Sequence, residues 1–140
     1  PAMLEAAVAG LDRGSGGAQA GILGVSVLTS LDEPDLRQIG FQRTPGQLVG
    51  RMAKLADASG CEGLVCSPLE LNVVAQAAPG LVRVTPGIRL GPSDDDQART
   101  ETPQEAIRKG ATYLVITMAV DPEAAARDIL DKIAGSAAGH

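Results

Sequence analysis

The sequence predicts an α/β fold in which helices alternate with parallel strands. Three observations support this fold class: short continuous apolar runs, helical periodicity between them, and a recurring motif at the helix starts. The chain has 140 residues, enough for one compact domain with a hydrophobic core. We therefore expect residues 1–140 to form a single α/β segment.

Four short runs rich in valine, isoleucine and leucine predict the strands. Each run is continuous rather than alternating between apolar and polar residues, which is typical of strands covered on both faces. The runs span residues 22–28, 63–66, 81–84 and 113–116.

Helix starts are marked by one repeated motif. A hydroxyl residue caps the helix, proline occupies the first turn, and glutamine or glutamate three residues later can hydrogen-bond back to the cap. The motif occurs at residues 44–47, 67–70 and 102–105, and Asp121-Pro122 opens the last helix similarly. We predict helices near residues 44–58, 67–78, 102–109 and 121–134, and an N-terminal helix with an apolar face over residues 3–11.

Strict alternation of strands and helices predicts parallel strands joined by right-handed crossovers. The strands recur at an average of roughly 30 residues, the size of one strand–helix unit. Two architectures remain open: half of a barrel, or a small open sheet. A complete eight-stranded barrel needs roughly 250 residues and does not fit. The absence of a Gly-x-Gly-x-x-Gly motif after the first strand argues against dinucleotide binding.

Composition excludes several function classes. The formal net charge is −5, with one Phe and one Tyr, which argues against nucleic-acid binding. No apolar run predicts a membrane span, and no secretory leader pattern opens the chain. Cys61 and Cys66 are too few and wrongly spaced for a metal knuckle, so we expect buried, reduced thiols in a cytoplasmic protein. Pro1 in place of an initiating methionine is expected of a processed or excised chain.

Several segments resemble, in order, the orotidine 5′-phosphate decarboxylase family. The most specific is Val84-Thr85-Pro86-Gly87-Ile88-Arg89, which looks like the family's seventh strand. The resemblance runs from residue 1 to about residue 134. The other matching segments are residues 24–30 for the fifth strand, 63–67 for the sixth, 96–103 for the phosphate-side loop, 111–116 for the eighth, and 1–4 for the helix after the fourth.

This resemblance implies a (β/α)8 TIM barrel, of which the chain would supply the C-terminal half, strands five to eight. It also implies an activity: decarboxylation of orotidine 5′-monophosphate to uridine 5′-monophosphate in de novo pyrimidine biosynthesis. The family's enzymes act on a small-molecule substrate, use no metal or organic cofactor, and are homodimers. We expect the same here, with neither a nucleic-acid nor a membrane partner.

The resemblance assigns substrate-binding roles to four residues. Thr29 would lie near the pyrimidine and ribose, Ser67 would hydrogen-bond the pyrimidine amide edge, and Arg89 and Gln97 would contact the phosphate. Directed N–H donors from a guanidinium or an amide suit a phosphate. Each residue also has a structural alternative: helix capping for Ser67, a plain strand end for Thr29, and solvated loop positions for Arg89 and Gln97. No metal site is expected at Asp94-Asp95-Asp96, which lies in the same loop.

The sequence departs from the family pattern in two places. It contains no Asp-x-Lys-x-x-Asp motif, the family's catalytic cluster, and Lys54, Lys109 and Lys132 fall in predicted helices that cannot replace it. The Gly-Arg segment that follows the family's eighth strand, and holds the phosphate, is also absent after Ile116. We therefore expect no catalytic residue in these 140 residues.

Two alternatives to the decarboxylase remain open. The first is a catalytically inert half-barrel that binds a phosphate or nucleotide and either pairs with a missing half or associates with itself. The second is a related barrel of the same superfamily that acts on sugar phosphates.

Overall fold

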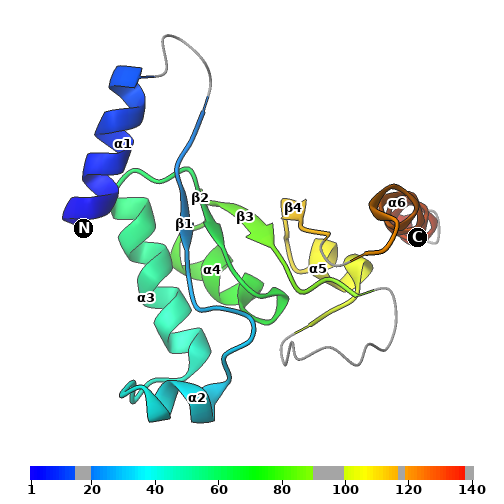
Figure 1. The fold of residues 1–140 in the computed structure, drawn as a ribbon, viewed down its shortest axis with the longest axis horizontal. Coiled ribbons are helices and arrows are strands. Elements are labelled where there is room, and N and C mark those ends of the chain that lie inside the picture. The colour runs from blue at the N-terminus through cyan, green and yellow to red at the C-terminus, as the bar shows by residue number, and fades with distance from the viewer. Residues whose placement is uncertain (15–19, 90–99, 117–118, 138–140) are drawn as a thin grey trace.

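A computed structural model of the chain describes residues 1–14, 20–89, 100–116 and 119–137. Its centre is one parallel sheet in the order β1-β2-β3-β4 (Figure 1). Sequential order is typical of a barrel segment, whereas a doubly wound sheet reverses its strand order. The strands are β1 (Leu23–Val25), β2 (Gly63–Val65), β3 (Val82–Thr85) and β4 (Tyr113–Leu114).

The predicted helices are present, with two differences. The predicted helix near residues 67–78 is divided into a short 3-10 helix, η1, and α4. A further helix, α2, was not predicted, although Asp32 and Asp35 signal its start. The Asp32 side chain accepts from the Asp35 N–H at 2.9 Å, and the Asp35 side chain accepts from the Asp32 N–H at 3.0 Å. None of the described helices is long and apolar enough to cross a membrane. The helices are α1 (Ala2–Gly14), α2 (Glu33–Gln38), α3 (Pro45–Ala58), η1 (Pro68–Glu70), α4 (Leu71–Ala77), α5 (Pro103–Arg108) and α6 (Pro122–Ala137).

The capping motifs differ in how completely they form. At the start of α3, Thr44 Oγ1 accepts from the Gln47 N–H at 3.3 Å, and the Gln47 side chain accepts from the Thr44 N–H at 3.2 Å. At the start of α5, Thr102 accepts from the Glu105 N–H at 3.3 Å, but the return bond is not made. The Glu105 carboxylate instead accepts hydrogen bonds from Arg108, which lower its pKa, so the reciprocal box predicted there was wrong.

Strand register divides the sheet into two faces. Val25, Val65, Val84 and Tyr113 lie opposite one another in one row, and the neighbouring row contains Leu64. Leu64 is buried under the helices, whereas Val25 and Tyr113 are 60% and 61% exposed. The expectation that both faces of the strands are covered was therefore wrong within the described residues. The helices α3 and α4 pack on the Leu64 face, with α4 behind the strands in Figure 1, and the other face is left open within the described residues.

The hydrophobic core lies between the sheet and the α3–α4 layer. Small residues allow this close packing: a Cβ added at Gly24 would lie 3.2 Å from Leu64 Cδ1 and 3.5 Å from Ala56 Cβ. Both cysteines are buried and form no disulfide, as predicted. The core residues include Val49, Ala53, Ala56, Leu64, Cys66, Leu71, Val74 and Leu81.

Two leucines on consecutive helices provide a matched test of this core. Leu71 is 0% exposed, whereas Leu69, two residues earlier, is 49% exposed. We expect Leu71→Ala to lower the free energy of unfolding by about 2–5 kcal/mol, because it leaves a cavity between α4 and the sheet. Leu69→Ala should lower it by less than about 1 kcal/mol. Urea denaturation followed by circular dichroism measures both; equal losses would contradict this placement of the core.

Burial raises the pKa of the Cys66 thiol from 9.0 to about 12; the negative charge of Glu70 adds to the rise, and Arg83 opposes it. The unfolded chain thus releases this proton at a lower pH than the folded chain does. The stability contributed by the protonated thiol is fully present below pH 9 and is lost progressively as the pH rises toward 12.

We expect the free energy of unfolding to fall less steeply over this alkaline range in Cys66→Ala than in the original chain, because the variant has no thiol to deprotonate. Denaturation curves at stepped pH values measure the slope, and Leu69→Ala serves as a control that keeps it. Parallel slopes in all three proteins would rule out the thiol as the cause.

Candidate functional site

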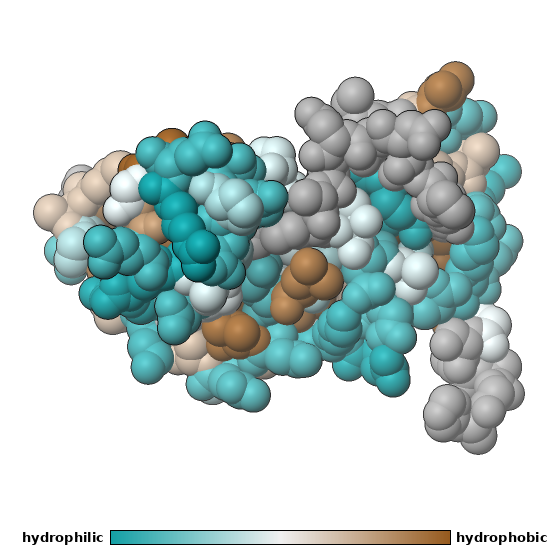
Figure 2. All heavy atoms as spheres, turned by 90° about the horizontal axis from the view of Figure 1, so that it is seen from below, coloured by the Kyte–Doolittle hydropathy of each residue, from teal (hydrophilic) through white to brown (hydrophobic). Residues whose placement is uncertain are grey.

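The carboxyl-terminal edge of the sheet is the candidate site. Because the strands are parallel, the loops that follow β1, β2 and β3 all leave from this edge, at the bottom of Figure 1. Barrels of strands and helices place their sites at this edge. Figure 2 views the molecule from that side and shows a mainly hydrophilic surface with separate hydrophobic patches.

Backbone hydrogen bonds continue past the strand ends and hold this edge together. The Ser26 N–H donates to the Val65 carbonyl at 3.1 Å, and the Cys66 N–H donates to the Val84 carbonyl at 3.1 Å. The Val115 N–H donates to the Thr85 carbonyl at 2.9 Å. Side chains that follow the strands are therefore carried by a rigid frame rather than by free loops.

Ser67 lies at this edge, two residues after β2. Its side chain is 0% exposed, and its Oγ accepts a hydrogen bond from the Leu69 N–H at 3.2 Å, at the start of η1. The structure thus confirms the capping role. A contact between Ser67 and a ligand stays a prediction.

Two other polar residues at the strand ends were not singled out from the sequence. The Ser26 hydroxyl donates to the Val65 carbonyl at 2.7 Å and ties the end of β1 to β2. The hydroxyl of Thr85 is buried and makes no hydrogen bond within the part of the chain that the structure describes. A buried hydroxyl without a partner costs about 1–3 kcal/mol. Their signal was a hydroxyl residue inside the first apolar run for Ser26, and directly after the third run for Thr85.

Arg89 stands where the loop after β3 begins. Its N–H donates to the Glu101 carbonyl at 3.0 Å, and the Glu101 N–H donates to the Gly87 carbonyl at 3.1 Å, which forms a short parallel bridge. The Glu101 carboxylate also pairs with Lys109, which lies just after α5 rather than inside it. These contacts join the two ends of the intervening loop and fix the backbone of Arg89. Its partly exposed guanidinium donates to the Ile88 carbonyl at 2.9 Å.

Thr29 lies farther from the sheet than expected. The strand predicted over residues 22–28 ends at Val25, and Thr29 sits in a turn closed by a bond from the Leu31 N–H to the Leu28 carbonyl at 3.1 Å. It is therefore a partly exposed turn residue at the same edge, not a strand-end residue. Gln97 lies outside the described residues.

Chemically, this edge offers hydrogen-bond donors and a cation rather than a nucleophile. The raised pKa of Cys66 keeps its thiol protonated at neutral pH. A protonated thiol is a weak nucleophile, because the thiolate is the reactive form. Among the described residues, no group of three His, Cys, Asp or Glu side chains could hold a metal ion. The described part of the site can therefore bind and orient a small polar ligand.

Two curated proteins that resemble this chain carry the same name. The chain is 45% identical over 118 residues to an orotidine 5′-phosphate decarboxylase of Pseudomonas fluorescens SBW25, covering 81% of this chain and 51% of that protein. A decarboxylase of the same name from Neisseria meningitidis Z2491 is 45% identical over 115 residues, covering 77% and 47%. The chain thus spans about half the length of these curated relatives.

Solved structures support the barrel half over the small open sheet. The crystal structure of an orotidine 5′-phosphate decarboxylase from Lactobacillus acidophilus matches with a TM-score of 0.73 and 31% identity, over 94% of this chain and 58% of that one. The Sulfolobus solfataricus enzyme matches in fold alone, with a TM-score of 0.59 and 17% identity, over 91% and 53%. The described sheet and helices are therefore about half of a (β/α)8 TIM barrel.

The match to a family model covers nearly the whole chain. The model describes the orotidine 5′-phosphate decarboxylase / HUMPS family and matches residues 1–129, which include all four strands and the candidate edge. The chain therefore belongs to the orotidine 5′-phosphate decarboxylase / HUMPS family.

Proposed function

We propose that this chain supplies the substrate-binding half of an orotidine 5′-phosphate decarboxylase. The enzyme would convert orotidine 5′-monophosphate to uridine 5′-monophosphate in de novo pyrimidine biosynthesis, as a carboxy-lyase. The observation that carries the proposal is the backbone bridge that fixes Arg89 at the start of a loop on the carboxyl-terminal edge. A guanidinium held there can donate two parallel hydrogen bonds to a phosphate.

The proposed roles assign two residues to each end of the substrate. Ser67 would contact the pyrimidine amide edge and Thr29 the pyrimidine–ribose region, while Arg89 and Gln97 would hold the phosphate. Phosphate contacts far from the reacting carbon can orient the pyrimidine at the reacting centre.

The bond-breaking step needs groups beyond these residues. Loss of carbon dioxide leaves a carbanion on the pyrimidine ring, which must be stabilised and then protonated. By family resemblance a lysine within the Asp-x-Lys-x-x-Asp motif supplies the proton, and these 140 residues contain no such motif. We propose that the chemistry requires the complementary half of the barrel and neither a metal nor an organic cofactor.

The remaining parts of the proposal follow the family. Residues 1–140 would act as a single α/β segment, the assembled enzyme would be a cytoplasmic homodimer, and its ligand would be a pyrimidine nucleotide. A net charge of −5 agrees with a small-molecule ligand rather than a nucleic acid.

A split-enzyme experiment tests this proposal. The 140-residue chain is co-expressed with the complementary half of the Pseudomonas fluorescens SBW25 relative in bacteria that lack their own decarboxylase. We expect growth without uracil and release of carbon dioxide from orotidine 5′-monophosphate by the purified pair, but no turnover by the chain alone. A purified complex of the two halves that forms uridine 5′-monophosphate no faster than the uncatalysed reaction would refute the proposal.

Within that complex, Arg89→Ala should lower kcat/KM about tenfold to a hundredfold, because a charge-assisted hydrogen bond to phosphate contributes roughly 1.5–3 kcal/mol. Arg127→Ala is the matched control, since Arg127 is exposed on α6 and pairs only with Glu123 among the described residues. Equal effects of the two substitutions would remove Arg89 from the site.

One observation favours the inert half-barrel as a second candidate. The uncovered face of the sheet carries Leu23, Val25 and Tyr113, all exposed, and β1 and β4 each pair on one side only. Exposed apolar faces and open strand edges promote association.

We expect the isolated chain to associate with itself in a concentration-dependent way, measurable by sedimentation velocity. Val25→Lys should weaken this association, because it places a charge on the uncovered face. Leu130→Lys should not, since it adds the same charge at an exposed site on α6. A stable monomer at every concentration would count against the self-associating half-barrel.

A further inference from the structure

Apart from the candidate edge, a hollow lies on the outer helical layer, between α3 and α4. Its volume is about 560 Å³, within the range typical of small-molecule sites. None of Thr29, Ser67 and Arg89 lines it. We call it the basic groove and define it by Gly46, Gly50, Arg51, Lys54, Val73 and Gln76.

The groove exists because two glycines of α3 face α4. A Cβ added at Gly50 would lie 3.1 Å from Val73 Cγ1, and one at Gly46 would lie 3.9 Å from Val73 Cγ2. Without side chains at these positions, the helices leave a hollow that is lined by Val73 and by polar side chains of both helices. The hollow is thus built into the helix pair.

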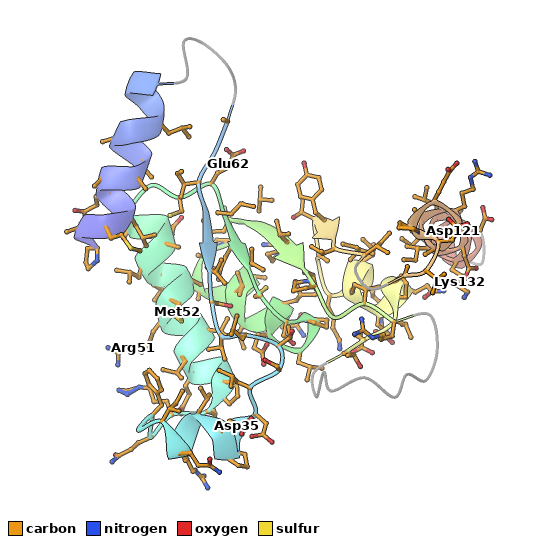
Figure 3. All side chains as sticks on the ribbon, in the orientation of Figure 1. Asp35, Arg51, Met52, Glu62, Asp121 and Lys132 are labelled. Carbon is orange, nitrogen blue, oxygen red and sulfur yellow. The ribbon has the colours of Figure 1, made fainter. Side chains whose placement is uncertain are left out.

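Positive charge accumulates along this groove. Arg51 and Lys54 lie three residues apart on one side of α3, and both are exposed. Arg43, just before the helix, joins Arg51 in lining an adjoining hollow of about 500 Å³. Figure 3 shows the Arg51 side chain extending outward from α3, away from the strands.

These three cations lack the acidic partners that other cations have. Arg43, Arg51 and Lys54 form no ion pair within the described ranges, and residues 39–56 contain no Asp or Glu. Elsewhere, several cations on the helices, or directly after one, form ion pairs with carboxylates. The paired cations are Arg37, Arg108, Lys109, Arg127 and Lys132.

We propose that the basic groove binds a small anion with two or more negative charges, of the phosphorylated-metabolite class, at a site separate from the carboxyl-terminal edge. The guanidinium of Arg51 and the ammonium of Lys54 supply charged donors, and the amide of Gln76 supplies a neutral one across the groove. The residues that line the groove include two cations and no carboxylate, so their charge favours an anionic ligand.

Inorganic pyrophosphate is the probe for this site. We would titrate it into the isotope-labelled 140-residue chain and follow backbone amide resonances by NMR. Saturable shifts are expected at Gly46, Gly50 and Gln76, and the affinity should fall as ionic strength rises.

The decisive comparison uses two double variants that remove the same charges. Arg51→Gln with Lys54→Gln should weaken pyrophosphate binding about tenfold or more, because two charge-assisted contacts are lost. Arg127→Gln with Lys132→Gln, on α6, should leave it unchanged. Lys54→Gln alone should give an intermediate loss, which keeps the test valid if the double variant unfolds.

Three outcomes would overturn the proposal. One is the absence of saturable shifts in the original chain. Another is an equal loss of affinity in the α3 and α6 double variants, which would indicate general charge attraction. The last is shifts confined to residues near Ser67 and Arg89, which would place pyrophosphate at the edge of the sheet. Because uridine 5′-monophosphate and decarboxylation are not the readout, failure here leaves the proposed enzyme function standing.

Discussion

The parallel alignment of β2 with its two neighbours is the constraint on which the rest of the structure depends. A Cβ at Gly63 would lie 2.6 Å from the Val82 carbonyl oxygen, so the β2–β3 approach requires glycine at this position. The shared direction brings the strand ends to one edge, and α3 and α4, which connect these strands, pack on one face. The same constraint therefore produces both the candidate site and the uncovered apolar face.

Local chemistry made much of this fold predictable, and tertiary context limited the rest. Thr44 and Gln47 form a reciprocal cap from groups within four residues, so the motif alone located the start of α3. At Thr102 the motif failed in part because Arg108, one turn later, attracts the Glu105 carboxylate more strongly. The strand at residues 22–28 was predicted too long, since apolar composition does not reveal where β2 stops offering hydrogen-bond partners.

The candidate site was predictable in type but not in detail. A family resemblance drew attention to Ser67 and Arg89, and both lie at the carboxyl-terminal edge. No sequence pattern indicated that the hydroxyl of Thr85 would be buried without a partner among the described residues, because that depends on how neighbouring strands pack. Ser67 at this edge combines a capping role, which the structure shows, with an expected binding role.

Net charge is a poor guide to anion binding in this molecule. The chain is acidic overall, yet its carboxylates are distributed so that those on α5 and α6 neutralise the cations beside them. On α3, Arg51 and Lys54 form no ion pair within the described residues, and the nearest acidic residue of the helix is Asp57 near its end. Within a Debye length of about 10 Å, nearby charges outweigh distant ones. The pairing of each cation, rather than the sum over the chain, therefore decides where this protein can attract a phosphate.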